Sequence, residues 1–209
     1  MKIYVACLAS YNNGVLHGIW FDLEDFVDDE DLMAAVRQEV LITSPFPNVE
    51  VECPRCGGDG LMLQDPGATC IQCKGSGEVP SAEEWAIHDH EGFPDDAVGE
   101  YTSFSKLYEI KEFYEEAETQ LGKDYEEIVE AFIGCFGGGD MSSVSQIQDA
   151  YVGQYDTHED FCQERWIDYG KIDKDSDLFS YIDWDHVWEG ELQHSYSEHN
   201  GHYFRSDWS

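Results

Sequence analysis

Two cysteine pairs with the same spacing constrain this chain more than any other feature. Residues 53–60 read CPRCGGDG and residues 70–77 read CIQCKGSG, so each pair has the form CxxCxGxG. Four thiolates about 2.3 Å from one Zn²⁺ form a closed tetrahedral site. Glycine lets the chain turn away from such a metal without steric cost. The spacing therefore predicts one structural zinc ion, with the ligands Cys53, Cys56, Cys70 and Cys73.

Two other functions of these cysteines fit the pattern less well. A redox CxxC is disfavoured, because two matched pairs are present and no thioredoxin-like sequence surrounds them. A catalytic zinc needs an open coordination position, which four cysteines do not leave. The remaining cysteines, Cys7, Cys135 and Cys162, lie among apolar residues and are expected to be small core residues.

The charge of the chain is strongly negative and widely spread. The 209 residues include 45 acids against 11 lysines and arginines, a formal net charge of −34. Residues 51–80 carry four acids and two bases, whereas residues 151–209 carry fourteen and four. The acids therefore form a coat over the folded parts and not a tail, and the cysteine segment is the least acidic part. Such a coat repels nucleic acid, so nucleic acid is not an expected partner.

The size of this charge can be compared with that of DNA. B-DNA carries one charge per about 1.7 Å of axis, so 34 charges match roughly 58 Å of duplex. A compact sphere of this chain length has a diameter of only about 43 Å. Matching the charge spacing of DNA therefore requires an elongated chain of several small domains. The alternative is an acidic surface that serves solubility alone, as in halophile-like proteins.

Local patterns predict an α+β fold in three parts. Residues 2–9 and 19–23 form a predicted β-hairpin with an Asn-Gly turn at 13–14, and residues 28–40 a helix. The predicted domains are an N-terminal α+β domain, residues 1–100, with the cysteine insertion at about 50–80; a helical middle domain, residues 101–147; and a C-terminal α+β domain, residues 148–209.

The middle domain begins with a strongly patterned helix. Apolar residues recur at helical spacing, and glutamates recur with the same period on the opposite side. Like charges at these spacings cost a few tenths of a kcal/mol per pair, and selection for helix stability alone would place lysines between them. The apolar stripe consists of Leu107, Ile110, Tyr114, Ala117 and Leu121, and the acidic stripe of Glu109, Glu112 and Glu116.

Enzymatic and membrane functions are not predicted. The sequence holds no GxSxG, Walker or dinucleotide motif, and its histidines match no HExxH-like ligand pattern. His88, His90, His194, His199 and His202 are therefore expected to be surface or packing residues. No run of 18 apolar residues and no basic-plus-apolar leader occurs, so a cytoplasmic protein is expected.

The two cysteine motifs resemble the zinc-binding repeats of DnaJ-type chaperones. The resemblance covers about 25 residues, and the J-domain of such chaperones is absent. It implies a borrowed structural knuckle pair and not a complete chaperone.

Several stretches outside the cysteine segment resemble the ArdA family of antirestriction proteins. They are aromatic-plus-acid strings with turn glycines, and their order matches that of the family. The stretches are IYVACLASYNNGVLHGIWFDL (3–23), EEWAIHDHEGFP (83–94), YVGQYDTHEDF (151–161), YIDWDHVW (181–188) and GHYFRS (201–206).

The resemblance implies an elongated, bent, three-domain inhibitor that forms a homodimer through its C-terminal region. Proteins of this family occupy the DNA-binding groove of type I restriction–modification enzymes and protect mobile elements that enter a new host. Their surface carboxylates imitate the phosphates of bent B-form DNA. The chain departs from the family in its cysteine segment, which typical members lack.

The acids predicted to imitate phosphates form a distributed set, so a single substitution is expected to have little effect. The main alternative is a zinc-dependent adaptor or chaperone-like module that binds another basic protein. The phosphate-mimicking set consists of Asp22, Glu24, Asp25, Asp28, Asp29 and Asp31 in the first domain, Glu109, Glu112 and Glu116 in the second, and Asp156, Glu159, Asp160, Asp183 and Asp185 in the third.

Overall fold

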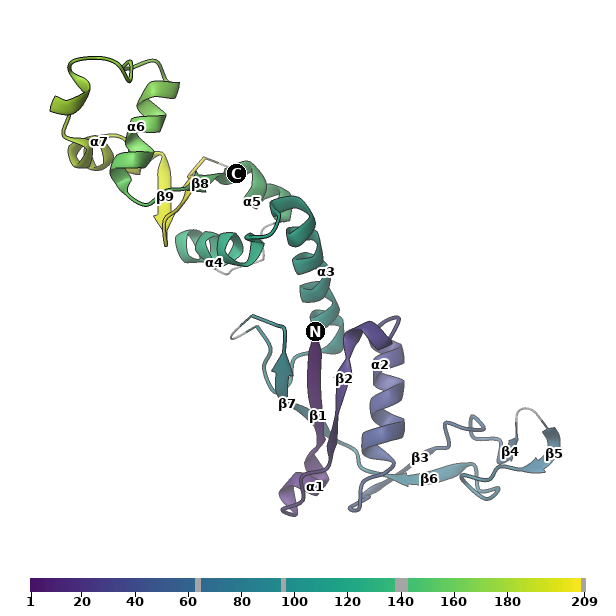
Figure 1. The fold of residues 1–209 in the computed structure, drawn as a ribbon. Coiled ribbons are helices and arrows are strands. Elements are labelled where there is room, and N and C mark those ends of the chain that lie inside the picture. The colour runs from purple at the N-terminus through teal and green to yellow at the C-terminus, as the bar shows by residue number, and fades with distance from the viewer. Residues whose placement is uncertain (63–64, 95–96, 138–142, 208–209) are drawn as a thin grey trace. The chain divides into compact units, whose positions relative to one another are not determined.

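The fold mixes helices with small antiparallel sheets, which confirms the α+β class. Figure 1 shows the computed structural model, which describes residues 1–62, 65–94, 97–137 and 143–207. The chain divides into two compact units, Met1–Lys111 and Glu112–Ser209. The finer division into three domains stays a prediction.

The first unit is built on a three-stranded antiparallel sheet in the order β2-β1-β7. Ile3 and Val5 lie two residues apart on the central strand and are both fully buried, because alternate residues of a strand face the same side. Figure 1 shows the three strands side by side. They are β1 (Lys2–Cys7), β2 (Gly18–Asp22) and β7 (Trp85–Glu91).

The connection between β1 and β2 corrects the expected hairpin. The two strands pair as predicted, but β1 ends at Cys7 and helix α1 (Leu8–Asn12) precedes the turn. The Cys7 sulfur accepts a hydrogen bond from the N–H of Ser10, whose hydroxyl lies 2.9 Å from that of Ser44. The composition of this segment is β-rich, and the contact with Ser44, which is distant in sequence, is not visible in it. The helix was therefore not predicted. Gly14 takes the positive φ that the turn requires, at +77°.

The helical layer of the first unit begins at an acidic cap. Asp28 accepts a hydrogen bond from the N–H of Asp31 at 2.9 Å, as expected for an N-cap residue. Leu32 is fully buried, and the helix continues into a π-helical turn that contacts β1 and β2. These elements are η1 (Leu23–Asp25), α2 (Asp29–Val36) and η2 (Arg37–Leu41).

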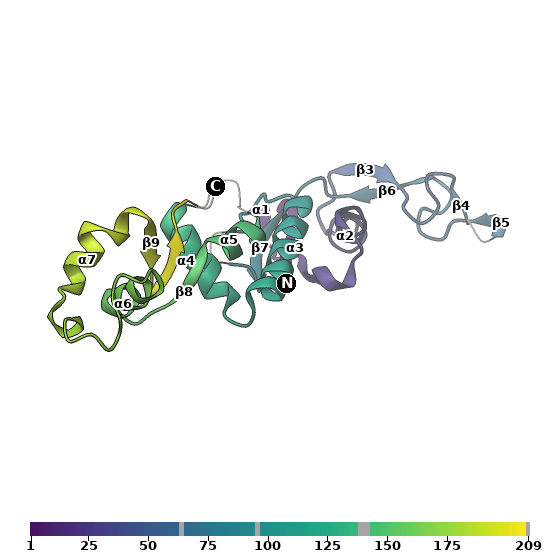
Figure 2. The same cartoon turned by 90° about the horizontal axis from the view of Figure 1, so that it is seen from above.

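A two-stranded ribbon leads from the end of η2 to the cysteine segment. Figures 1 and 2 both show its strands β3 and β6 side by side, with β4 and β5 beyond them. The N–H of Ala82 donates to the carbonyl of Leu41 at 3.0 Å, so the segment leaves and re-enters the unit at one place. The four strands are β3 (Val49–Glu52), β4 (Leu61–Met62), β5 (Asp65–Thr69) and β6 (Glu78–Ser81).

The second unit packs helices on a sheet of order β8-β10-β9. Helix α4 contacts β9 and β10, and α6 contacts α7. The boundary between the units falls inside α3 (Phe104–Leu121). The other elements are α4 (Tyr125–Phe136), α5 (Val144–Ala150), β8 (Tyr151–Gln154), α6 (His158–Asp168), η3 (Phe179–Tyr181), α7 (Trp184–Gly190), η4 (Leu192–His194), β9 (Tyr196–His199) and β10 (His202–Arg205).

Aromatic residues pack in both cores of the second unit and form most of the second one. Phe132 and Phe204 meet edge to face in one core, and Phe161 and Tyr203 stack at 4.1 Å in the other. Strand β9 was not predicted, because its sequence YSEH is polar and becomes a strand only by pairing with β10. No helix in the described part of the chain is both long and apolar enough to cross a membrane.

Candidate metal centre and acidic surface

Four cysteine side chains converge at the far end of the β3–β6 ribbon. All four are buried, and their Sγ atoms lie within 4.8 Å of one another. The distance from Cys53 Sγ to Cys70 Sγ is 3.9 Å, and that from Cys56 Sγ to Cys73 Sγ is 3.7 Å. Sulfurs at about 2.3 Å from a tetrahedral Zn²⁺ lie roughly 3.8 Å apart, so this arrangement fits such an ion. The predicted ligands therefore form a site that can hold a metal ion.

Each cysteine pair sits on a tight turn of backbone. In the first turn, the N–H of Gly57 donates to the carbonyl of Cys53 at 2.9 Å, and the N–H of Gly60 donates to Cys56 Sγ at 3.3 Å. The N–H of Cys70 donates to the carbonyl of Gly60 at 2.8 Å, which ties the second pair to the first. These backbone hydrogen bonds hold the four sulfurs on one side of the two turns, close to one another.

Close contact between the turns explains two of the glycines. A Cβ on Gly60 would lie 2.5 Å from the carbonyl oxygen of Gly75, and one on Gly77 would lie 2.2 Å from that of Gly58. Both distances are far below van der Waals contact, and both glycines have positive φ. The glycines are therefore needed for the two cysteine pairs to approach each other.

The substitution Gly77→Ala is accordingly expected to weaken metal binding by at least about tenfold, because it adds both a backbone clash and left-handed strain. Competition for the metal with a chromogenic chelator measures this. Gly67→Ala is the control, since a Cβ there meets no atom within 4 Å. Equal losses in the two variants would contradict the packing argument.

The thiols of the cluster differ in their acidity. Burial raises the pKa of Cys56 to about 12. Burial also acts to raise the pKa of Cys73, but hydrogen bonds from the backbone of Gly77 and Gly75, together with those from the thiols of Cys56 and Cys70, lower this pKa to about 6. A bound divalent cation favours the thiolate form of all its ligands, because it offsets their mutual repulsion.

Very few apolar side chains support the cluster. Among the residues of this segment that the structure describes, the buried core holds only Val79 besides the cysteines, with Ile42, Val51 and Met62 packed against it. Small modules of this kind depend on a metal or disulfides for their stability. All seven cysteines are free, so a metal is the group that suits this segment.

The acids predicted to imitate phosphates lie mainly on the surface. Twelve of the fourteen side chains are exposed, and Asp22 and Asp29 are half-buried. The exposed members are Glu24, Asp25, Asp28, Asp31, Glu109, Glu112, Glu116, Asp156, Glu159, Asp160, Asp183 and Asp185.

Some members of this set also have local structural partners. Asp22 lies 3.6 Å from Lys2 Nζ, and Glu24 lies 3.2 Å from Lys111 Nζ. Asp183 accepts a hydrogen bond from the N–H of His186 at 3.1 Å and so caps α7. A capping carboxylate still presents its second oxygen to solvent, so these roles are compatible with external contacts.

The acidic stripe of α3 lies where the period predicts. Leu107, Ile110 and Ala117 are buried, whereas Glu112 and Glu116 are exposed. Other exposed acids on these helices lie outside the predicted set. Exposed glutamates of α3 and α4 that the prediction omitted are Glu115, Glu118, Glu126, Glu127 and Glu130.

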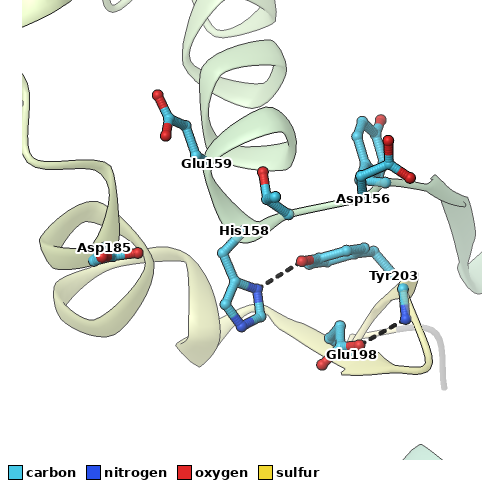
Figure 3. A pocket seen from close by; sticks show the side chains of 9 residues that line it. Asp156, His158, Glu159, Asp185, Glu198 and Tyr203 are labelled. Atoms are coloured by element: carbon cyan, nitrogen blue, oxygen red, sulfur yellow. Dashed lines mark hydrogen bonds between the residues drawn. The ribbon is translucent and has the colours of Figure 1, made fainter.

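Three predicted acids of the second unit meet around one cavity (Figure 3). Asp156, Glu159 and Asp185 line a space of about 480 Å³ together with Glu198, which was not predicted. Glu198 accepts a hydrogen bond from the N–H of Gly201 at 2.8 Å. The prediction missed it because it lies on β9, whose position depends on sheet pairing.

His158 forms one side of this cavity. Its Nδ1 lies 2.6 Å from the hydroxyl of Tyr203, and its ring stacks on Trp188 at 4.4 Å. Burial raises the pKa of Tyr203 well above its usual value, so this hydroxyl stays protonated. The cavity is therefore lined by carboxylates and by aromatic side chains.

Comparison with known proteins agrees with the sequence resemblance. The family model described as antirestriction protein (ArdA) matches residues 3–205. The chain belongs to the ArdA family. The match spans nearly the whole sequence, including the range that contains the cysteine segment. No curated protein sequence matches the chain.

ArdA proteins are inhibitors, and one histidine of this family member lies in its core. His202 is 2% exposed and its Nδ1 lies 3.0 Å from the hydroxyl of Tyr151. Burial lowers the pKa of His202, which keeps the ring neutral in the core. Among the described residues, the four cysteines form the only cluster whose ligand atoms converge as for a metal ion.

The three other cysteines are used in packing. Cys7 and Cys162 are fully buried, and Cys135 is half-buried on α4. The expectation that these are small core residues is confirmed for Cys7 and Cys162.

Proposed function

We propose that this ArdA-family protein inhibits type I restriction–modification enzymes by occupying their DNA-binding groove as a mimic of B-form DNA. The inhibitor needs no catalytic group. A DNA-binding groove presents lysines and arginines in register with phosphates, and the protein offers carboxylates in their place. The antirestriction character of the family supports this proposal.

The exposure of the predicted acids is the observation that carries the proposal. Carboxylates that project into water can pair with the cations of a groove, and such pairs are formed without burying an isolated charge. The coat also attracts a basic groove over several ångströms, so association is fast and falls steeply with salt. The acids act as a set, in which each exposed ion pair with the target contributes roughly 0.2–1 kcal/mol to the binding free energy.

The proposal includes a cytoplasmic homodimer joined through the C-terminal region, with the three-domain arrangement expected for the family. It also includes one zinc ion at the cysteine cluster, held by Cys53, Cys56, Cys70 and Cys73. The sulfur distances and the four-thiolate chemistry suit zinc. The ion would supply stability to the segment and leaves no open position for chemistry.

The protein is expected to block DNA binding by the methyltransferase core of a type I enzyme, with inhibition that weakens as salt rises. A mobility-shift competition over a salt series measures this. A plasmid-restriction assay gives the matching result in cells, where expression should protect incoming unmodified DNA. Unimpaired DNA binding at a stoichiometric excess of the protein would contradict the proposal for that enzyme.

A zinc-dependent adaptor is the second candidate. Ile71 is 67% exposed on the cysteine segment, and Leu61 is also exposed, as in surfaces that bind other proteins. In that case the cysteine segment would carry the activity. Removal of the metal, described in the Discussion, separates the two candidates.

A further inference from the structure

A groove lies at the root of the cysteine segment, entirely within the first unit. Its volume is about 610 Å³, which is typical of sites that bind ligands or side chains. It lies between the end of η2, strand β3 and the first cysteine turn. The apolar residues that line it are Leu41, Ile42, Val49, Val51, Pro54 and Ala82.

The apolar wall of the groove follows from the alternation of β3. Val49 and Val51 are half-buried on one face of the strand, and Glu50 and Glu52 are exposed. Val51 also packs against the cysteine cluster, as does Ile42. The shape of the groove therefore depends on the metal centre.

The rim of the groove is charged. Glu52 and Glu83 are exposed carboxylates at its edge, with Arg37 as the one cation among the residues that line it. The side chain of Glu52 lies over the first cysteine turn, within 3.1 Å of the position of a Cβ on Gly58. The combination of an apolar floor and two carboxylates complements an apolar side chain with a lysine or arginine beside it.

We propose that this groove receives an apolar side chain flanked by a basic residue of the same restriction enzyme that the acidic coat binds. This inference rests on the proposed function and adds a contact of a different physical kind. Ion pairs between exposed groups weaken with salt, whereas burial of apolar surface does not. The cysteine segment thus supplies a salt-resistant part of the affinity.

The two kinds of contact leave different signatures in a salt series. Each ion pair contributes to the slope of log K against log salt concentration, as in protein–DNA binding. An apolar contact shifts the whole line and leaves the slope unchanged. Substitution in the groove is therefore expected to lower affinity equally at every salt concentration.

The test variant is Val49→Gln, because Val49 lines the groove without being one of the residues packed against the cysteine cluster. Binding of the full-length protein to the methyltransferase core of a type I enzyme is measured by titration over a salt series. About a tenfold loss with an unchanged slope is expected, as for the loss of one buried aliphatic contact. Ile71→Gln is the matched control, since this residue lies on the same segment outside the groove, and it should bind normally.

If Val49→Gln loses its metal or unfolds at a lower temperature than the wild type, a second variant still tests the inference. Glu83→Lys reverses a rim charge at an exposed position, and it should weaken binding and lower the salt slope by about one ion pair. Normal binding by whichever of these variants folds would overturn the inference. The oligomeric state of the unbound Val49→Gln variant is measured as well. A change from the wild-type state would also overturn the inference, because it would mean that the groove contacts another copy of the chain.

Failure of the proposed function gives a different result. In that case the wild-type protein itself would not bind the methyltransferase core at any salt concentration, and the groove would lose its partner as well. Binding by the wild type with no effect of the groove variants overturns the groove alone.

Discussion

Neutralising the acidic stripe of α3 is expected to weaken inhibition while leaving the helix as stable as before or more so. The triple variant Glu109→Gln, Glu112→Gln and Glu116→Gln removes three charges that lie opposite the buried face of α3. If each pair with the target contributes up to about 1 kcal/mol, the triple variant loses up to roughly a hundredfold in affinity at low salt. Each single variant should lose only a few-fold.

This prediction is specific because affinity for the target should fall while the stability of the helix should hold or rise. Like charges at i,i+3 and i,i+4 destabilise a helix by a few tenths of a kcal/mol per pair. Their removal should offset the loss of the exposed ion pair between Glu109 and Lys106, whose charged atoms lie 3.0 Å apart, so the thermal midpoint should hold or rise. Affinity for the methyltransferase core and the unfolding midpoint are the two measurements. A fall in the midpoint that accompanies the loss of inhibition would assign the effect to the fold.

A control with the same change of charge tests the position of the acids. The exposed residues Asp173, Asp175 and Asp177 lie outside the predicted set. Their triple substitution by asparagine also adds three to the net charge. It should leave inhibition nearly unchanged. An equal loss in this control would mean that total charge, and not the predicted set, determines binding.

Removing two ligands of the metal centre is expected to have the largest effect on structure. The variant Cys53→Ser plus Cys56→Ser should release the metal and unfold the segment, whose described core holds Val79 besides the cysteines. Apparent binding free energies of structural zinc are about 10–16 kcal/mol, which far exceeds what Val79 and its neighbours supply. Metal content and the NMR spectrum of the segment measure the change.

The rest of the first unit should stay folded in this variant. Its sheet and helix pack through Ile3, Val5 and Leu32, which are fully buried apart from the cysteine cluster. Inhibition at low salt should remain within about tenfold of the wild type, because only the groove contact is lost. Cys135→Ser is the control and should keep its metal. Complete loss of inhibition with an intact sheet would favour the zinc-dependent adaptor.

Features that depend on local sequence were predictable. The two CxxCxGxG motifs place four ligands within 21 residues, so their convergence follows from short turns and glycine. The apolar and acidic stripes of α3 follow from the helical period alone. The order of aromatic-plus-acid strings indicated the ArdA family, which the family match then showed.

Features that depend on contacts between distant residues were not predictable from the sequence. Helix α1 is stabilised by a hydrogen bond between the hydroxyls of Ser10 and Ser44, a contact that no local pattern in the sequence indicates. Glu198 joins the acidic cavity only because β9 pairs with β10. The groove beside Val49 exists because the ribbon returns to Leu41.

The sequence by itself determined the four cysteines that converge, the acidic coat and the family of this protein. Each of these is set by residue type and short spacing, which do not change on folding. Only the tertiary structure decided which carboxylates face water, which of them share a cavity, and where the cysteine segment leaves an apolar groove. These depend on which distant elements pack together, and that choice reflects the burial of apolar surface over the whole chain.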